Sequence, residues 1–269
     1  YKKSKIVFDA IKKKNWDQAT KLARNDEVLK KIIEWNFIYQ NNNPKFSSKT
    51  SNFIKQNPNW PEKKFFRKKI ELFIDSHLNN KKIIQFFEEN PPLTTKGAVN
   101  YVDALRKENG LDNVKNIARK TWVTRKFTKG QSKDFYKKYK KILRIEDHLK
   151  RIEMLTWSGR SYEAKRMLPL INKSKRNLYN AKIILRRRAG NVDYAVSLIN
   201  TELLNDPGLI YERLRWRRKS RLYNTAFELI DPLPNNLKYE KKWWFEISII
   251  IRKLIENKEY KKAYNLIKD

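Results

Sequence analysis

Apolar side chains recur along the chain with the period of an α-helix. In segment 243–255, the residues Trp243, Ile247, Ile250 and Leu254 are separated by four, three and four positions. Because an α-helix has about 3.6 residues per turn, this spacing places them on one face. Three neighbours widen the predicted stripe: Trp244, Ile251 and Ile255. The segment is therefore predicted to be a helix with one broad apolar face.

Segment 61–78 shows a similar pattern, and its apolar residues are Phe65, Phe66, Ile70, Phe73, Ile74 and Leu78. Pro61 is expected to open this helix. Asp206 followed by Pro207 predicts an N-cap with proline in the first helical position. Two proline pairs are expected to end helices, because proline lacks the amide donor and clashes with the preceding turn: Pro91 with Pro92, and Pro232 with Pro234.

A small residue recurs in the same local pattern in five segments, at Ala19, Ala164, Ala195, Ala226 and Ala263. Three positions later stand Leu22, Met167, Leu198, Leu229 and Leu266, and four positions later Ala23, Leu168, Ile199, Ile230 and Ile267. Three positions earlier stand Trp16, Val192, Tyr223 and Tyr260, whereas Ser161 breaks the pattern. A weaker sixth copy consists of Leu111, Val114, Ile117 and Ala118, with valine in the alanine position.

The repeat predicts tightly crossing helices, because a small side chain lets two antiparallel helices approach closely. The last four alanines are separated by 31, 31 and 37 residues, which is about one helical hairpin each. Hairpins of this size cannot bury their apolar faces alone, so they stack on one another. We therefore expect an all-α fold, an α-solenoid or superhelix of antiparallel hairpins with tetratricopeptide-like stacking. A closed helical bundle would also have small residues at its contacts, but the recurring register favours the solenoid.

Segment 126–134, which contains Gly130 and several polar residues, is the best candidate for a loop between two halves. We accordingly expect an N-terminal helical half over residues 1–130 and more regular C-terminal repeats over residues 131–269.

The composition indicates a packed core and a strong positive charge. Hydrophobic residues make up 40% of the chain, and only 6 glycines and 9 prolines are present, which favours long helices with short corners. The net charge of +33 predicts attraction to an anionic partner, although abundant Lys, Asn and Ile also suggest an AT-rich gene. The absence of cysteine excludes disulfides and thiolate sites, and no apolar run reaches the length of a membrane span.

Catalytic motifs are not found. The histidines, His77 and His148, form no metal spacing, and the sequence has no glycine-rich phosphate loop. The cluster from Glu146 to His148 is interpreted as the acidic start of a helix, and Glu88-Glu89 as a solvated helix end. We expect no cofactor and no metal, and this segment by itself does not resemble an enzyme.

Two basic clusters stand 31 residues apart, the distance between repeats: Arg186-Arg187-Arg188 and Arg217-Arg218-Lys219. Stacked repeats would bring them to equivalent places and form a basic ridge that attracts an anionic polymer. The simpler alternative is that these cations complement helix C-termini. The tryptophans are mostly expected in the core, and Trp243, in the adjacent pair with Trp244, is retained as a candidate for stacking on a ligand.

A distinctive block of residues runs from Asp206 to Arg218, DPGLIYERLRWRR. This block and several shorter ones resemble the superhelical region of alphaproteobacterial soluble lytic transglycosylases, which cleave peptidoglycan. The other blocks follow in the family's order: Asn57–Pro61, Glu146–His148, Trp157–Arg160 with Glu163–Pro169, and Lys242–Trp244. The resemblance covers nearly the whole chain.

The resemblance implies a periplasmic protein that cleaves the β-1,4 bond between N-acetylmuramic acid and N-acetylglucosamine and leaves a 1,6-anhydro end. In that family a lysozyme-like domain with a catalytic Glu-Ser motif follows the superhelical scaffold. This sequence contains no Glu-Ser dipeptide, so no catalytic residue is assigned. The implied partners are peptidoglycan glycan strands and the protein's own catalytic domain, with no nucleic acid. Candidate glycan-binding residues are Arg186, Arg187, Arg217, Arg218 and Trp243.

Two other interpretations remain open. A nucleic-acid-binding helical-repeat protein would share the charge and the hairpins, although a base-by-base reader needs more constant spacing. A tetratricopeptide-like protein-binding module would share the small-residue repeat.

Overall fold

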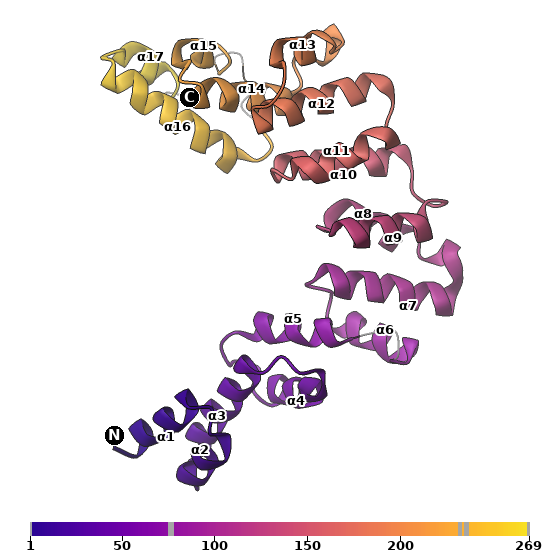
Figure 1. Ribbon diagram of the computed structural model, residues 1–269, viewed down its shortest axis with the longest axis vertical. Coiled ribbons are helices and arrows are strands. Elements are labelled where there is room, and N and C mark those ends of the chain that lie inside the picture. The colour runs from indigo at the N-terminus through magenta and orange to yellow at the C-terminus, as the bar shows by residue number, and fades with distance from the viewer. Residues whose placement is uncertain (1, 75–77, 231–232, 234–236, 268–269) are drawn as a thin grey trace. The chain divides into compact units, whose positions relative to one another are not determined.

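Helices are the only regular elements in residues 2–74, 78–230, 233 and 237–267, which are the residues that the computed structural model describes. These residues form seventeen α-helices and three short 3₁₀ helices (Figure 1). The prediction of an all-α fold is confirmed. The chain divides into two compact units, Tyr1–Thr121 and Trp122–Asp269.

In the first unit, each helix packs mainly on its neighbours in the sequence, such as α1 on α2, α4 on α5 and α6 on α7. Its elements are α1 (Lys2–Lys12), α2 (Trp16–Ala23), α3 (Glu27–Gln40), η1 (Pro44–Phe46), α4 (Ser47–Gln56), α5 (Lys63–Phe73), α6 (Asn80–Glu89) and α7 (Thr95–Asn113). The boundary between the units falls within α8 (Lys115–Thr124).

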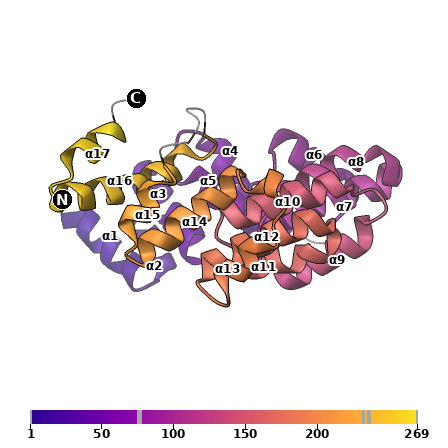
Figure 2. The same cartoon turned by 90° about the horizontal axis from the view of Figure 1, so that it is seen from above.

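In the second unit, long and short helices alternate from α10 onward. The elements are α9 (Lys129–Tyr139), α10 (Ile145–Trp157), α11 (Ser161–Met167), η2 (Leu168–Leu170), α12 (Lys173–Arg187), α13 (Val192–Ser197), η3 (Thr201–Leu203), α14 (Pro207–Lys219), α15 (Tyr223–Phe227), α16 (Glu240–Glu256) and α17 (Tyr260–Asn265). The long helices contact one another in sequence, α10 with α12, α12 with α14 and α14 with α16. Each short helix packs on the long helix before it, as Figure 2 shows for α12 and α13.

The recurring alanines occupy one structural position. Each is the fourth residue of a short helix, in α2, α11, α13, α15 or α17, and each is at most 4% exposed. All five are therefore buried in helices that pack on the preceding helix. Three flanking residues of the pattern do not join the core, because Leu198, Tyr260 and Ile267 are exposed.

A left-handed backbone residue precedes each of these alanines by five positions. These residues are Lys14, Gly159, Gly190, Arg221 and Lys258, with φ between 56° and 81°. At Gly159, the next residue, Arg160, donates its N–H to the carbonyl of Leu155, which closes the end of α10. A left-handed residue followed by this hydrogen bond ends a helix and reverses the chain. The weaker sixth copy differs, because Gly110 precedes Val114 by four positions.

Several helix limits differ from the prediction. Helix α5 begins at Lys63 after Glu62, whose φ is 63°, so Pro61 stands outside it, and Leu78 lies beyond its end at Phe73. The expected loop at 126–134 is shorter, because Thr128 and Gln131 form a capping box that starts α9 and places Gly130 inside the helix. Helix α6 ends at Glu89 before the first proline pair, as expected. Pro232 and Pro234 lie outside the described residues.

The apolar face of α16 is narrower than predicted. Trp243, Ile250 and Leu254 are buried in the core of the second unit, together with Ile251. Trp244 and Ile255, which were expected to widen this face, are 59% and 48% exposed.

Helix α5 carries two buried charges that bind the ends of other helices in the first unit. The ammonium group of Lys69 donates to the carbonyls of Ile38, Tyr39 and Asn41 at the end of α3. The carboxylate of Glu71 accepts from the N–H groups of Leu93 and Thr94 at the start of α7. Each charge thus meets the helix end of opposite partial charge.

Candidate functional site: the arginine–glutamate pairs of the second unit

The five candidate residues all lie in the second unit, on three long helices. Arg186 and Arg187 end α12, Arg217 and Arg218 are in the last turn of α14, and Trp243 is in the first turns of α16. The arginines fall at helix C-termini, where a cation favourably meets the carbonyl end of the helix dipole.

Arg186 forms a buried ion pair with the next long helix. Its Nη2 atom is 2.5 Å from Oε1 of Glu212 on α14, and the two side chains are 16% and 4% exposed. Its guanidinium also lies over the ring of Tyr211, 5.6 Å from the centroid. Arg215 donates from Nη1 to the carbonyl oxygen of Arg186 at 3.2 Å. Arg186 therefore joins α12 to α14.

Arg218 repeats this arrangement one hairpin further along. Its Nε donates to the carboxylate of Glu246 on α16, and Nε of Arg215 lies 3.9 Å from the other oxygen of Glu246. The Glu246 side chain is 3% exposed. Each of these two glutamates thus forms an ion pair with an arginine of the preceding long helix.

A lysine forms a third pair at the start of α14. Nζ of Lys182 on α12 is 2.5 Å from Oδ1 of Asp206, which also caps α14 by accepting from the N–H of Leu209 at 2.9 Å. The predicted N-cap with proline at the first helical position is confirmed. A Cβ at Gly208 would lie 2.8 Å from this Nζ, so an alanine there would displace the ammonium group. We call these three sets of ion pairs, Lys182–Asp206, Arg186–Glu212 and Arg215/Arg218–Glu246, the ion-pair row.

Burial controls the electrostatics of this row. It raises the pKa of Glu212 to about 7, and the charges of Arg186 and Arg215 oppose this shift only in part. Burial also raises the pKa of the Tyr211 hydroxyl beside it. The row is therefore a structural contact between hairpins in which one carboxyl can gain a proton near neutral pH.

The remaining two candidate arginines are closer to solvent. Arg187 is exposed, and its guanidinium lies 4.5 Å from the ring centroid of Tyr162. Arg217 is partly exposed and donates to the carbonyl of Thr225. Arg188 and Lys219, which complete the two basic clusters, are exposed. The arginines that form buried ion pairs are Arg186 and Arg218, so the two clusters do not have the same contacts position by position.

Trp243 is packed among aromatic rings. It is 2% exposed, and its ring lies 5.2 Å from that of Tyr211 and 6.3 Å from that of Trp157. Its faces are covered by protein in this structure, whereas the adjacent Trp244 is open to solvent.

The acidic and histidine candidates have structural contacts. The Asp147 carboxylate accepts from the N–H of Arg144 at the start of α10, and Nδ1 of His148 accepts from Nε1 of Trp122 at 3.1 Å. Burial lowers the pKa of His148. Glu88 and Glu89 are exposed at the end of α6, and His77 lies outside the described residues. Within the described residues no cluster of three metal-binding side chains occurs.

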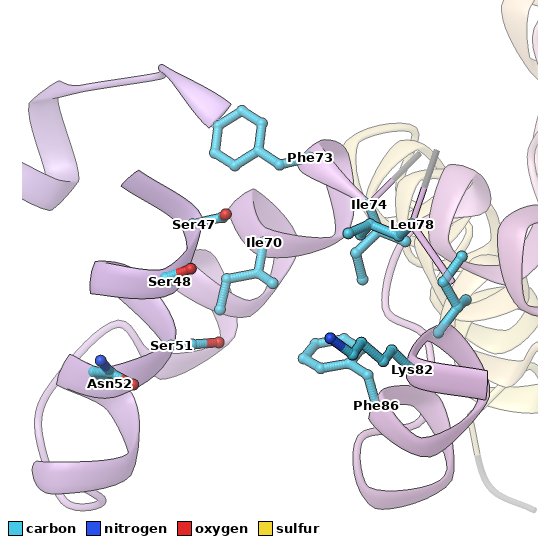
Figure 3. Close-up of a pocket in the computed structure, with 11 residues that line it drawn as sticks. Ser47, Ser48, Ser51, Asn52, Ile70, Phe73, Ile74, Leu78, Lys82 and Phe86 are labelled. Atoms are coloured by element: carbon cyan, nitrogen blue, oxygen red, sulfur yellow. The ribbon is translucent and has the colours of Figure 1, made fainter. Parts of the chain in front are cut away.

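A hollow in the first unit lies between α4 and α6, with α5 as its floor (Figure 3). Its volume is about 320 Å³. One wall carries Ser47, Ser48, Ser51 and Asn52, and the other surfaces are mainly apolar, with Lys82 at the edge. Sequence patterns did not predict this hollow, because its polar wall and its apolar floor come from different helices.

Comparison with known proteins found no matching family model, curated protein or solved structure. In the part of the chain that the structure describes, no helix is both long and apolar enough to span a lipid bilayer.

Proposed function

We propose that this chain is the superhelical scaffold of a periplasmic peptidoglycan lytic transglycosylase, which positions glycan strands for a lysozyme-like catalytic domain. The observation that carries the proposal is the Asp206–Arg218 block, the most specific part of the resemblance. In the structure its charged residues have defined contacts: Asp206 caps α14 and pairs with Lys182, Glu212 pairs with Arg186, and Arg218 pairs with Glu246. The block thus contains the residues that join three successive hairpins, which supports its use as a mark of this scaffold.

The α-solenoid is part of the proposal. The consecutive contacts of α10, α12, α14 and α16, with a short helix packed on each, support tetratricopeptide-like stacking of antiparallel hairpins. Stacked hairpins present extended surfaces on which a linear polymer can bind.

The positive charge supports an anionic polymer as the ligand. Peptidoglycan stem peptides carry carboxylates, and a net charge of +33 attracts them over a distance set by the salt concentration. The two arginines beside the ion-pair row that solvent reaches, the exposed Arg187 and the partly exposed Arg217, are the candidates for direct contact. The chain itself supplies binding, because the Glu-Ser motif of the catalytic domain does not occur in it.

Sedimentation with purified sacculi tests this assignment. The double variant R187E/R217E is compared with K63E/K64E, which changes the net charge equally at exposed residues of α5. We expect R187E/R217E to weaken binding severalfold more than K63E/K64E. Equal losses would indicate unspecific attraction, and unchanged binding of R187E/R217E would reject the proposed site. Sequencing of the gene beyond the codon for Asp269 tests the parent enzyme, because a lysozyme-like domain with Glu-Ser is expected there.

The second candidate is a basic helical-repeat module that binds nucleic acid or protein, and the observation that favours it is the same net charge. A fluorescent single-stranded RNA and a DNA duplex are titrated at several salt concentrations. Affinity for either that exceeds the affinity for sacculi at physiological salt would favour this candidate.

A further inference from the structure

The solvent-exposed face of α16 has the same types of residue as the face of α14 that contacts α16. Glu212 and Glu246 are equivalent, since each forms an ion pair with an arginine of the preceding long helix. A shift of 34 residues relates them, and the same shift takes Tyr211 to Phe245 and Arg218 to Arg252. Helix α16 therefore carries, in register, the residue types that α14 uses to hold its successor.

On α14, the next helix covers these positions. Tyr211 is 4% exposed and its ring is 5.2 Å from that of Trp243, while Arg218 donates to Glu246. Trp243 and Glu246 thus fill adjacent places on α14 with an aromatic ring and a carboxylate.

On α16, the equivalent positions are open. Phe245 is 60% exposed, and Arg252 is exposed without an ion-pair partner among the residues that the structure describes. Trp244 and Ile255, at 59% and 48% exposed, lie on the same side, because 100° per residue places all four within an arc of about 100°. Glu246 is at least 100° away from each of them, toward α14. Large apolar side chains grouped on an exposed face mark an interaction surface.

We propose that this surface, Trp244, Phe245, Arg252 and Ile255, binds an amphipathic helix that carries a large apolar residue and, three positions later, a glutamate. The occupant lies on α16 as α16 lies on α14: its apolar residue covers Phe245 and its carboxylate pairs with Arg252. The surface continues the series of contacts that joins α12, α14 and α16, and its cation defines the charge of the partner. This inference concerns a protein partner and is independent of the proposed glycan ligand.

A peptide derived from α16 itself is the probe, because it has Trp243 and Glu246 at the required spacing. A synthetic peptide of residues 239–257 is made with the changes W244Q, F245Q, R252Q and I255Q, so that only its docking face remains apolar. Its affinity for the full chain is measured by fluorescence anisotropy. We expect saturable binding that falls at least about tenfold in the chain variants R252E and F245Q, as for other close interfacial charge pairs.

A charge exchange separates this pairing from unspecific adhesion. A peptide that additionally carries E246K should bind the unaltered chain at least about tenfold more weakly than the first peptide does. The same E246K peptide should bind the R252E chain with restored affinity, because the two charges are then exchanged. K165E, at an exposed residue of α11, makes the same change in net charge away from this surface. It is the control and should leave the affinity within about twofold. All substituted residues of the chain are exposed, so the variants should keep the helical content and unfolding temperature of the original chain. Circular dichroism measures both.

Absence of peptide binding, or binding that R252E leaves unchanged, would overturn the proposal. Sedimentation equilibrium of the chain alone is the second measurement. A dimer that F245Q disperses would identify a second copy as the occupant and would also overturn it.

Discussion

Nη2 of Arg186 on α12 lies 2.5 Å from Oε1 of Glu212 on α14, and this buried pair crosses the interface between two consecutive hairpins. Arg218 and Glu246 cross the next interface in the same way. Charges in these places have lost most of their hydration, so each depends on its partner. Each pair joins one long helix to the next.

Removal of the arginine alone should be strongly destabilising. In R186A, the Glu212 carboxylate stays buried without its ion-pair partner, and we expect a loss of about 3–5 kcal/mol in the free energy of unfolding at pH 8. The double variant R186M/E212M should recover most of this loss, because it leaves no buried charge. Urea unfolding measures both, and R187A, which changes the exposed neighbour, should stay within about 0.5 kcal/mol. A cost in R186A no larger than that in R187A would show that the pair does not support the stack.

Stability should also depend on pH through Glu212. Burial raises its pKa to about 7 in the folded protein, above the ordinary value of 4.5 for a glutamate. The folded state therefore binds this proton more tightly than the unfolded state. Its stabilising contribution is complete below pH 4.5 and is lost as the pH rises through 7.

The difference between the original chain and E212Q isolates this group. Between pH 5 and pH 8.5, the free energy of unfolding of the original chain should fall relative to that of E212Q by up to about 3 kcal/mol. Urea titrations at half-unit pH intervals measure it. Parallel profiles for the two proteins would mean that the carboxylate is ionised throughout this range.

Gly208 provides a steric test of the Lys182–Asp206 pair. An added Cβ would lie 2.8 Å from Nζ of Lys182 and 3.2 Å from Oδ1 of Asp206, so G208A should displace the ammonium group and lower stability by about 1–3 kcal/mol. G130A is the matched control, because Gly130 lies in α9 with nothing within 4 Å of its added Cβ. There alanine should stabilise the helix by up to about 1 kcal/mol. Equal effects in thermal unfolding would contradict this assignment.

The buried alanines test the repeat itself. Ala164 is fully buried at the fourth position of α11, so A164L should force the crossing helices apart and cost at least about 1–3 kcal/mol. Lys165, the next residue, is exposed, and K165L should change stability by no more than about 0.5 kcal/mol. Chemical unfolding measures the free energy of unfolding of both variants. An unchanged value in A164L would show that the small residue is not needed for helix packing at this position.

At the residues with left-handed backbone, a change to glycine and a change from glycine should have opposite effects on stability. Arg221 adopts φ 62°, where glycine is unstrained, so R221G should stabilise the protein by up to about 1 kcal/mol. Gly159 adopts φ 73° without a close neighbour, so G159A should cost about 1 kcal/mol through backbone strain alone. Differential scanning calorimetry measures both shifts, and effects of the same sign would refute a backbone origin.

The sequence by itself determined the helical class, the five buried alanines and the cap at Asp206, because each depends on residues within about one helical turn of each other. It also indicated that arginines end α12 and α14. Local pattern was not sufficient to predict where α5 and α9 begin, because capping residues decide where each helix starts. It also did not predict which apolar residues of α16 are buried, because this depends on the neighbouring helices.

Tertiary structure alone decided what the charged residues contact. Arg186 pairs with Glu212 and Arg218 with Glu246, residues 26 and 28 positions away on the next long helix. The sequence contains a hint in the Glu-x5-Arg spacing shared by α14 and α16, at Glu212 with Arg218 and Glu246 with Arg252. Periodicity specifies which side of a helix a residue occupies, but the identity of its partner depends on how far one hairpin is displaced along the next. That displacement is set by packing over the whole interface, so only the folded chain reveals which arginines are paired and that Arg252 is still open.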